Sequence, residues 1–244
     1  AGRLVVVGCY TIPTPRSTER ERRALREISS AAQMTINANR SWQRLELLLA
    51  ANFGRRDLHV VLTYDDEHLP ANRQAVKRVR KMLPQLRAVR KSRGQELKYI
   101  YVTEQLSSEG GRLHHHLIIN GTGADLDVLR SLWPYGEVEL EPLDTWQGYE
   151  ALAKYLTKEP RELGKPEVGA RNWAASLGLK KPKVESEIVK DNLTVAAPPG
   201  AVILSAPPPV RNEFGEFVVL KYYLPIRKKE EKKGTRPPRR RKRK

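Results

Sequence analysis

ELKYIYVTEQLSSEGGRLHHHLIIN, residues 96–120, has the pattern of two strands joined by a tight turn. Residues 96–104 and 112–120 are rich in β-branched and aromatic side chains, which favour extended backbone. The SSEGG segment between them supplies the small and glycine residues that a hairpin turn needs. We therefore expect an antiparallel β-hairpin at the centre of the fold.

Helical and extended patterns alternate on both sides of this hairpin. In chain order the expected elements are a strand over 57–64, a basic helix over 71–93, the two hairpin strands, a helix over 124–133, a strand over 136–143 and a helix over 148–159. The order β-α-β-β-α-β-α is that of a ferredoxin-like or RRM-like α+β fold. Such a fold has an antiparallel sheet with helices packed on one face, and we expect the other face to be open for a ligand.

The sequence predicts additions on either side of a core domain over residues 55–165. Residues 1–54 predict an N-terminal strand and helix, and residues 166–226 predict strands added to the core sheet. Residues 227–244, RKKEEKKGTRPPRRRKRK, have almost no apolar side chains and predict a disordered basic tail. The tail has two open interpretations, nonspecific attraction to phosphates and solubilisation.

The formal net charge of the chain is +17 and its pI is about 10.1, which predict a polyanionic partner. Nucleic acid is favoured over an anionic membrane, and we expect no membrane partner, because no stretch approaches the roughly 20 consecutive apolar residues of a spanning helix. The single cysteine, Cys9, excludes an internal disulfide and a cysteine-based zinc site. We expect a reducing, cytoplasmic location, and any metal must be held by His, Asp or Glu.

Three adjacent histidines lie on the second strand of the hairpin. Side chains alternate along a strand, so His114 and His116 project from one side, about 6.6 Å apart, while His115 points the other way. Glu104 ends the preceding strand, at a depth that places it opposite these histidines. Two imidazoles and one carboxylate leave ligand positions open on an octahedral ion, which suits Mg²⁺ or Mn²⁺. The alternative is a set of ordinary hydrogen-bonded strand histidines.

Two further groups of polar residues are candidate chemical sites. Tyr155 and Lys158 are three residues apart on the 148–159 helix and so share a face, although such pairs are common in packing and solvation. Asp65, Asp66 and His68 offer metal ligands, but the segment YDDEHLP follows a strand and is more simply a polar turn. The tyrosine gains value only if it meets the histidine pair across the sheet.

Five blocks in order resemble the HUH endonucleases, specifically the rolling-circle replication initiators of plasmids and phages. The blocks are AANFGRRDLHVVLTYDDEHLP, LKYIYVTE, GRLHHHLIING, LWPYGEVE and LAKYLTKEP, and the likeness extends over roughly residues 40–184. His115 stands where many members of that superfamily have a bulky apolar residue. The position four before Tyr155 is Ala151, and Tyr149 falls on another helix face, so the chain resembles the single-tyrosine type.

The resemblance implies a nicking and joining enzyme that initiates rolling-circle DNA replication. Tyr155 would attack a phosphodiester of one DNA strand, leaving a 5′-phosphotyrosine and a free 3′-OH, and Lys158 would steady the tyrosinate or the phosphate. A divalent ion, Mg²⁺ or Mn²⁺, on His114, His116 and Glu104 would polarise the phosphate. The implied partners are single-stranded or extruded DNA at an origin, then a host helicase and polymerase, in the cytoplasm of a bacterial host.

Four basic residues are the candidates for DNA contacts: Arg112, Lys154, Lys180 and Lys181. Two alternatives from other functional classes stay open. The first is a noncatalytic single-strand binder with Tyr99 and Tyr101 exposed on an RRM-like sheet. The second is a basic structural protein, such as a ribosomal one, whose charge is its whole function. Neither gives a reason for the alignment of the histidines with Glu104.

Overall fold

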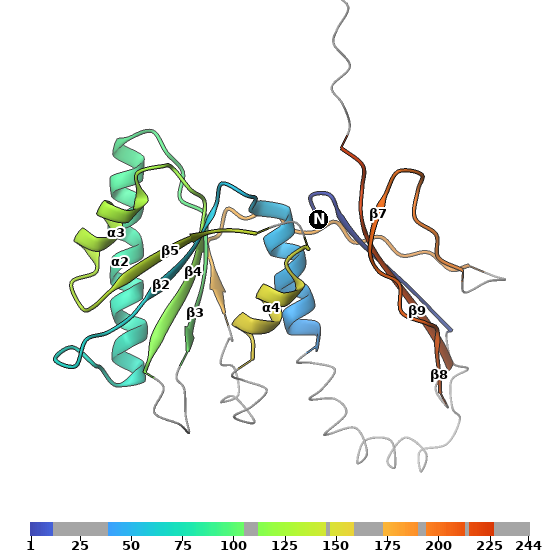
Figure 1. Cartoon of the computed structure of the whole chain (residues 1–244), viewed down its shortest axis with the longest axis horizontal. Helices are drawn as coiled ribbons and strands as arrows, with labels where there is room; N and C mark the ends of the chain where they lie inside the picture. The colour runs from blue at the N-terminus through green and yellow to red at the C-terminus, as the bar shows by residue number, and fades with distance from the viewer. Residues whose placement is uncertain are drawn as a thin grey trace, which may run out of the picture.

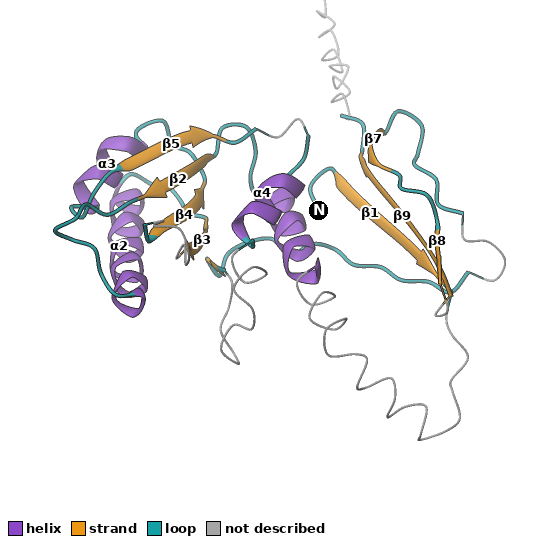
Figure 2. Ribbon diagram, turned by 60° about the horizontal axis from the view of Figure 1, so that its bottom comes forward, coloured by secondary structure: helices purple, strands orange, loops and turns teal. Residues whose placement is uncertain are grey.

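The structure, a computed structural model, describes residues 1–11, 39–104, 112–144, 147–158, 173–189, 194–212 and 215–226. A five-stranded sheet lies on one side of the molecule and a smaller sheet on the other, with two helices between them (Figures 1 and 2). The described residues 39–52 form one of these helices, and α4 (Glu150–Leu156) is the other. The predicted basic tail, residues 227–244, lies outside the described residues.

The larger sheet has the strand order β5-β2-β4-β3-β6, and every neighbouring pair is antiparallel. Its strands are β2 (Leu58–Leu62), β3 (Tyr99–Glu104), β4 (His114–Ile119), β5 (Val138–Pro142) and β6 (Ala174–Ala175). The predicted hairpin is the β3–β4 pair, in which Tyr99 is opposite Ile119 and Glu104 is opposite His114. The α+β, ferredoxin-like fold class is therefore confirmed.

One face of this sheet is covered by α2 (Asn72–Ser92) and α3 (Asp125–Leu132). The apolar stripe of α2 packs against alternate residues of the central strands, among them Val60, Leu62 and Leu117. The two helices are also joined by a buried ion pair, in which Arg90 Nη2 lies 2.8 Å from Asp125 Oδ1. Among the described residues, no helix has both the length and the apolar character that crossing a bilayer requires.

The element order predicts that the opposite face of the sheet is open, and this prediction is wrong. The 39–52 helix and α4 pack on it, and Trp42, Leu45 and Leu49 join Ile118 in a second hydrophobic cluster. The physical reason is that the apolar stripe of the 39–52 helix needs an apolar partner surface, and the second face of the sheet supplies one.

The second sheet joins the two ends of the described chain. It contains β1 (Leu4–Tyr10), β7 (Val202–Ser205), β8 (Val210–Asn212) and β9 (Gly215–Tyr223), with β9 paired to each of the others. Of the strands expected from residues 166–226, β6 extends the core sheet, whereas β7, β8 and β9 belong to this separate sheet. The long register of β1 with β9, from Leu4 opposite Tyr223 to Tyr10 opposite Phe217, accounts for the difference.

Candidate functional site

Strand alternation and hairpin register bring three potential metal ligands to one place. Glu104 is the last residue of β3 and lies directly across from His114, the first residue of β4. His116 lies two positions further along β4 and therefore projects from the same face. This face also carries Ile118, which packs beneath the 39–52 helix and α4. The cluster therefore lies on the sheet face that these helices cover.

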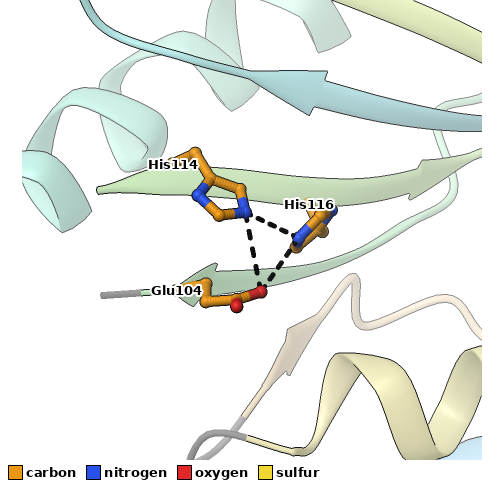
Figure 3. A group of neighbouring side chains, drawn as sticks. All are labelled: Glu104, His114 and His116. Carbon is orange, nitrogen blue, oxygen red and sulfur yellow. Dashed lines mark hydrogen bonds and ion pairs between the residues drawn. The ribbon is translucent and has the colours of Figure 1, made fainter. Parts of the chain in front are cut away.

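The three side chains converge, as Figure 3 shows. His114 Nε2 lies 2.9 Å from His116 Nε2, and Glu104 Oε2 lies 3.1 Å from His116 Nε2 and 3.5 Å from His114 Nε2. Ligand atoms sharing an edge around a six-coordinate ion, with bonds of about 2.1 Å, are about 3.0 Å apart. One ligand atom from each residue thus fits a divalent metal, and two histidines with one carboxylate leave other coordination positions for a substrate.

The surroundings keep His116 in the form that binds a metal. His116 and Glu104 are buried, and His114 is partly buried. Burial, together with the neighbouring His114 and His59, lowers the pKa of His116 to about 4, although Glu104 acts in the opposite direction. His116 is therefore a neutral imidazole at physiological pH, with a lone pair available for coordination.

Tyr155 and Lys158 reach the cluster from α4. The ring of Tyr155 meets that of His116 edge to face, with 5.2 Å between centroids, and the tyrosine remains 42% exposed. Lys158 lies just past the helix end, where its Nζ is 2.8 Å from Glu104 Oε1 and 4.3 Å from the centroid of the Tyr155 ring. The structure thus brings all five predicted site residues together, with the accessible hydroxyl-bearing ring beside the potential metal ligands.

Tyr149, the other tyrosine of this segment, is placed differently. It is 2% exposed and packs in the hydrophobic cluster under the sheet face. Its hydroxyl donates a hydrogen bond of 2.7 Å to the backbone carbonyl of Phe53, and burial raises its pKa. Of these two tyrosines, Tyr155 is therefore the exposed one.

The four basic residues predicted to contact DNA lie in different surroundings. Arg112 is half exposed, pairs with Asp66, and its backbone carbonyl is 2.8 Å from His114 Nδ1, so it borders the cluster. Lys154 pairs with Glu150 and lies over the Trp42 ring, away from Glu104. Lys180 and Lys181 are exposed, and Asn52 holds the backbone of Lys180 with hydrogen bonds of 2.7 and 2.9 Å.

Asp65, His68 and His115 have structural roles. Asp65 Oδ1 accepts a 2.8 Å hydrogen bond from the backbone N–H of His68 and lies 2.7 Å from its Nδ1, which is the geometry of a polar turn. His115 is fully buried on the opposite face of the sheet, as strand alternation predicted. Its two ring nitrogens lie 2.8 Å from the Tyr64 hydroxyl and 2.9 Å from the Thr103 hydroxyl.

One residue at the site was missed from the sequence. His59 on β2 stacks on His116, with ring centroids 5.1 Å apart, and its Nε2 lies 3.0 Å from His116 Nδ1. Strand alternation gives the signal that was available. Val61 pairs with His116, and His59 is two residues before Val61, so it must share the same sheet face.

A comparison with known protein families agrees with the position of the candidate site. Residues 57–160 match the family model described as replication-associated protein ORF2/G2P. The matched stretch is less than half of the chain, but it runs from β2 past α4 and contains Glu104, His114, His116, Tyr155 and Lys158. No curated protein and no solved structure matches the chain. The match supports a replication initiator that binds DNA at an origin, and the cluster fits a divalent metal site.

Proposed function

We propose that this protein nicks and rejoins single-stranded DNA through a tyrosine, and so initiates rolling-circle replication. The observation that carries the proposal is the convergence of one exposed tyrosine, Tyr155, on a buried cluster of two histidines and a carboxylate. The matched family concerns DNA replication, and the net charge of +17 suits a polyanionic substrate. Each of these supports the proposal from a different direction.

In the proposed reaction the phenolic oxygen of Tyr155 forms a bond to a DNA phosphorus. The bond from that phosphorus to the 3′ oxygen breaks, and the phenol proton is balanced by the proton that the 3′-hydroxyl gains. Attack in reverse by a 3′-hydroxyl rejoins the strand, because the phosphotyrosine keeps the energy of the original ester. The free 3′ end is the primer that replication requires.

The residues around Tyr155 have separate parts in this reaction. Lys158, whose Nζ lies beside the ring, stabilises negative charge on the tyrosine oxygen or on the phosphate. Glu104, His114 and His116 would hold a divalent metal, Mg²⁺ or Mn²⁺, which would supply charge stabilisation at the phosphate. Arg112 borders the cluster and is positioned to meet the DNA backbone.

The noncatalytic alternative finds less support in the arrangement of aromatic residues. An RRM-like binder stacks bases on aromatic side chains exposed on its sheet. Tyr101 is instead 7% exposed, packs in the core beneath α2 and accepts a hydrogen bond from Arg80. Tyr99 is partly buried against the same core, with Arg87 over its ring. Neither forms an open stacking platform.

A covalent-adduct assay tests the proposal. The protein is incubated with a library of single-stranded oligonucleotides and Mn²⁺, with and without a chelator, and the products are separated on a denaturing gel. We expect a protein–DNA adduct that needs the metal and disappears in Tyr155→Phe. Tyr149→Phe is the matched control and should keep the adduct, since Tyr149 is buried. Equal adduct from Tyr155→Phe, or no adduct from the wild type, would contradict the proposal.

A further inference from the structure

The two histidines of the metal cluster are each anchored through the ring nitrogen that faces away from Glu104. His114 Nδ1 lies 2.8 Å from the backbone carbonyl of Arg112, an acceptor, so this nitrogen carries the proton and Nε2 keeps its lone pair. A backbone carbonyl cannot change its role, and the tautomer of His114 is therefore fixed by the chain itself. His116 has no such carbonyl at its Nδ1 but faces His59.

His59 is placed to do for His116 what a backbone carbonyl does for His114. Its Nε2 lies 3.0 Å from His116 Nδ1, and the two rings are stacked at an interplanar angle of 28°. His59 is largely buried, and Nε2 is its ring nitrogen that faces His116. Its other nitrogen, Nδ1, points toward the exposed Glu141, whose Oε2 is 4.0 Å away.

We propose that His59 is a positioning residue that holds His116 in the tautomer with Nε2 free for metal. In this arrangement His116 donates its Nδ1 proton to Nε2 of His59, and His59 keeps its own proton on Nδ1, toward Glu141. The opposite tautomer of His116 would place a proton on Nε2, between the ring and Glu104 Oε2 at 3.1 Å, where the metal must bind. A partner of this kind typically changes metal affinity by 10- to 100-fold.

His59 is not a fourth ligand in this geometry. Its Nε2 is directed at the far nitrogen of His116, whereas the atoms that converge within 4.8 Å of one another come from Glu104, His114 and His116. The inference rests on the proposed metal-dependent function. It concerns a residue that acts through His116 and not on the metal itself. Two substitutions separate its parts, because His59→Phe keeps the stacked ring without the acceptor, and His59→Gln keeps an acceptor without the ring.

Two measurements test the inference. Mn²⁺ binding to the full chain, measured by calorimetry, should weaken at least 10-fold in His59→Phe and stay within about 3-fold of wild type in His59→Gln. His68→Phe, which removes a partly exposed histidine from the polar turn, is the control and should bind as wild type does. Nitrogen-15 NMR of the Mg²⁺-bound protein should show the His116 Nδ1 proton hydrogen-bonded to His59 in the wild type, and this hydrogen bond should be lost in His59→Phe.

The outcomes distinguish this inference from the proposed function. Equal Mn²⁺ affinity of His59→Phe and wild type, or a His116 Nδ1 proton that makes no hydrogen bond to His59 in the Mg²⁺-bound wild type, overturns the role of His59 while leaving the nicking reaction standing. Wild-type protein that binds no Mn²⁺ removes the metal from the proposed function, and the role of His59 falls with it. Because neither measurement uses DNA, a failure of nicking alone does not affect them.

Discussion

Lys158 lies 2.8 Å from Glu104, Nζ to Oε1, while the other carboxylate oxygen faces the histidines. The same ammonium group is 4.3 Å from the centroid of the Tyr155 ring. One lysine therefore links the carboxylate of the metal cluster to the proposed nucleophile. This position suits a cation that first neutralises the site and then stabilises charge that develops on the tyrosine oxygen or the phosphate.

We expect Lys158→Met to slow adduct formation by about 100-fold, since removing one preorganised charge-stabilising group has effects of that order. Lys154→Met is a matched control on the same helix, because Lys154 contacts Glu150 and Trp42 instead. The initial rate of adduct formation at saturating oligonucleotide is the measurement. Similar rates for the two variants would show that Lys158 has no special part in the reaction.

We expect substitutions in the Glu104–His114–His116 cluster and in the Asp65 turn to have different effects on metal binding. Glu104→Gln or His114→Ala removes one of the three converging ligand atoms, and we expect Mn²⁺ affinity to fall at least 100-fold. Asp65→Asn should leave the affinity unchanged, because Asp65 is engaged in its turn with His68. Mn²⁺ titration followed by electron paramagnetic resonance measures both, and an equal loss in Asp65→Asn would move the metal to the turn.

The metal cluster was predictable because its geometry is local. Strand alternation assigns His114 and His116 to one face, and a hairpin fixes which residue lies across from each, so Glu104 follows from the sequence. Tyr155 was not predictable in this way. Its approach to His116 depends on how α4 packs across the sheet, and only the resemblance to replication initiators indicated that meeting.

The second sheet shows where local patterns fail. Alternation predicts that β1 and β9 are strands, but pairing Leu4 with Tyr223 needs contacts between the two ends of the described chain. The covered sheet face is a similar case. The apolar stripe of the 39–52 helix was visible in the sequence, yet nothing in its spacing said which surface it would cover. Lys221, in the segment LKYYLP, likewise gave no sign in the sequence of being buried.

The environment of His115 predicts a pH dependence of stability. Burial lowers its pKa from 6.5 to about 3, with smaller contributions from His114 and His116. The unfolded chain therefore binds a proton at His115 that the folded chain refuses between those values, and stability falls as pH decreases below about 6.5. The stability that depends on a neutral His115 is fully present above about pH 6.5. Between about pH 6.5 and pH 3 it decreases by an amount that approaches about 1.4 kcal/mol per pH unit.

Urea unfolding of the metal-free protein at pH 7 and pH 5 measures this dependence. His115→Gln retains a donor and an acceptor for Tyr64 and Thr103 but does not titrate. We expect the wild type to lose about 1–2 kcal/mol more than His115→Gln between the two pH values. Parallel losses in the two proteins would mean that His115 is not the group responsible.

Lys221 on β9 attaches the second sheet to the two helices beside it. Its Nζ lies 2.9 Å from each carboxylate oxygen of Glu46 and also contacts Glu150, so one strand residue bridges the 39–52 helix and α4. Burial raises the pKa of Glu46 even though Lys221 opposes the shift. Removing the lysine alone therefore leaves a buried carboxylate without its main compensating charge.

We expect Lys221→Met to reduce the free energy of unfolding by about 3–5 kcal/mol, and the double variant Lys221→Met/Glu46→Leu to recover most of that loss. The recovery follows because a well-packed apolar pair avoids the desolvation of two charges, whereas one unpaired charge does not. Chemical denaturation of the three proteins gives the comparison. Lys183→Met, which breaks an exposed pair with Glu185, is the control and should change stability by less than about 1 kcal/mol. If the double variant is no more stable than Lys221→Met, the loss comes from packing of the lysine stem and not from the orphaned charge of Glu46.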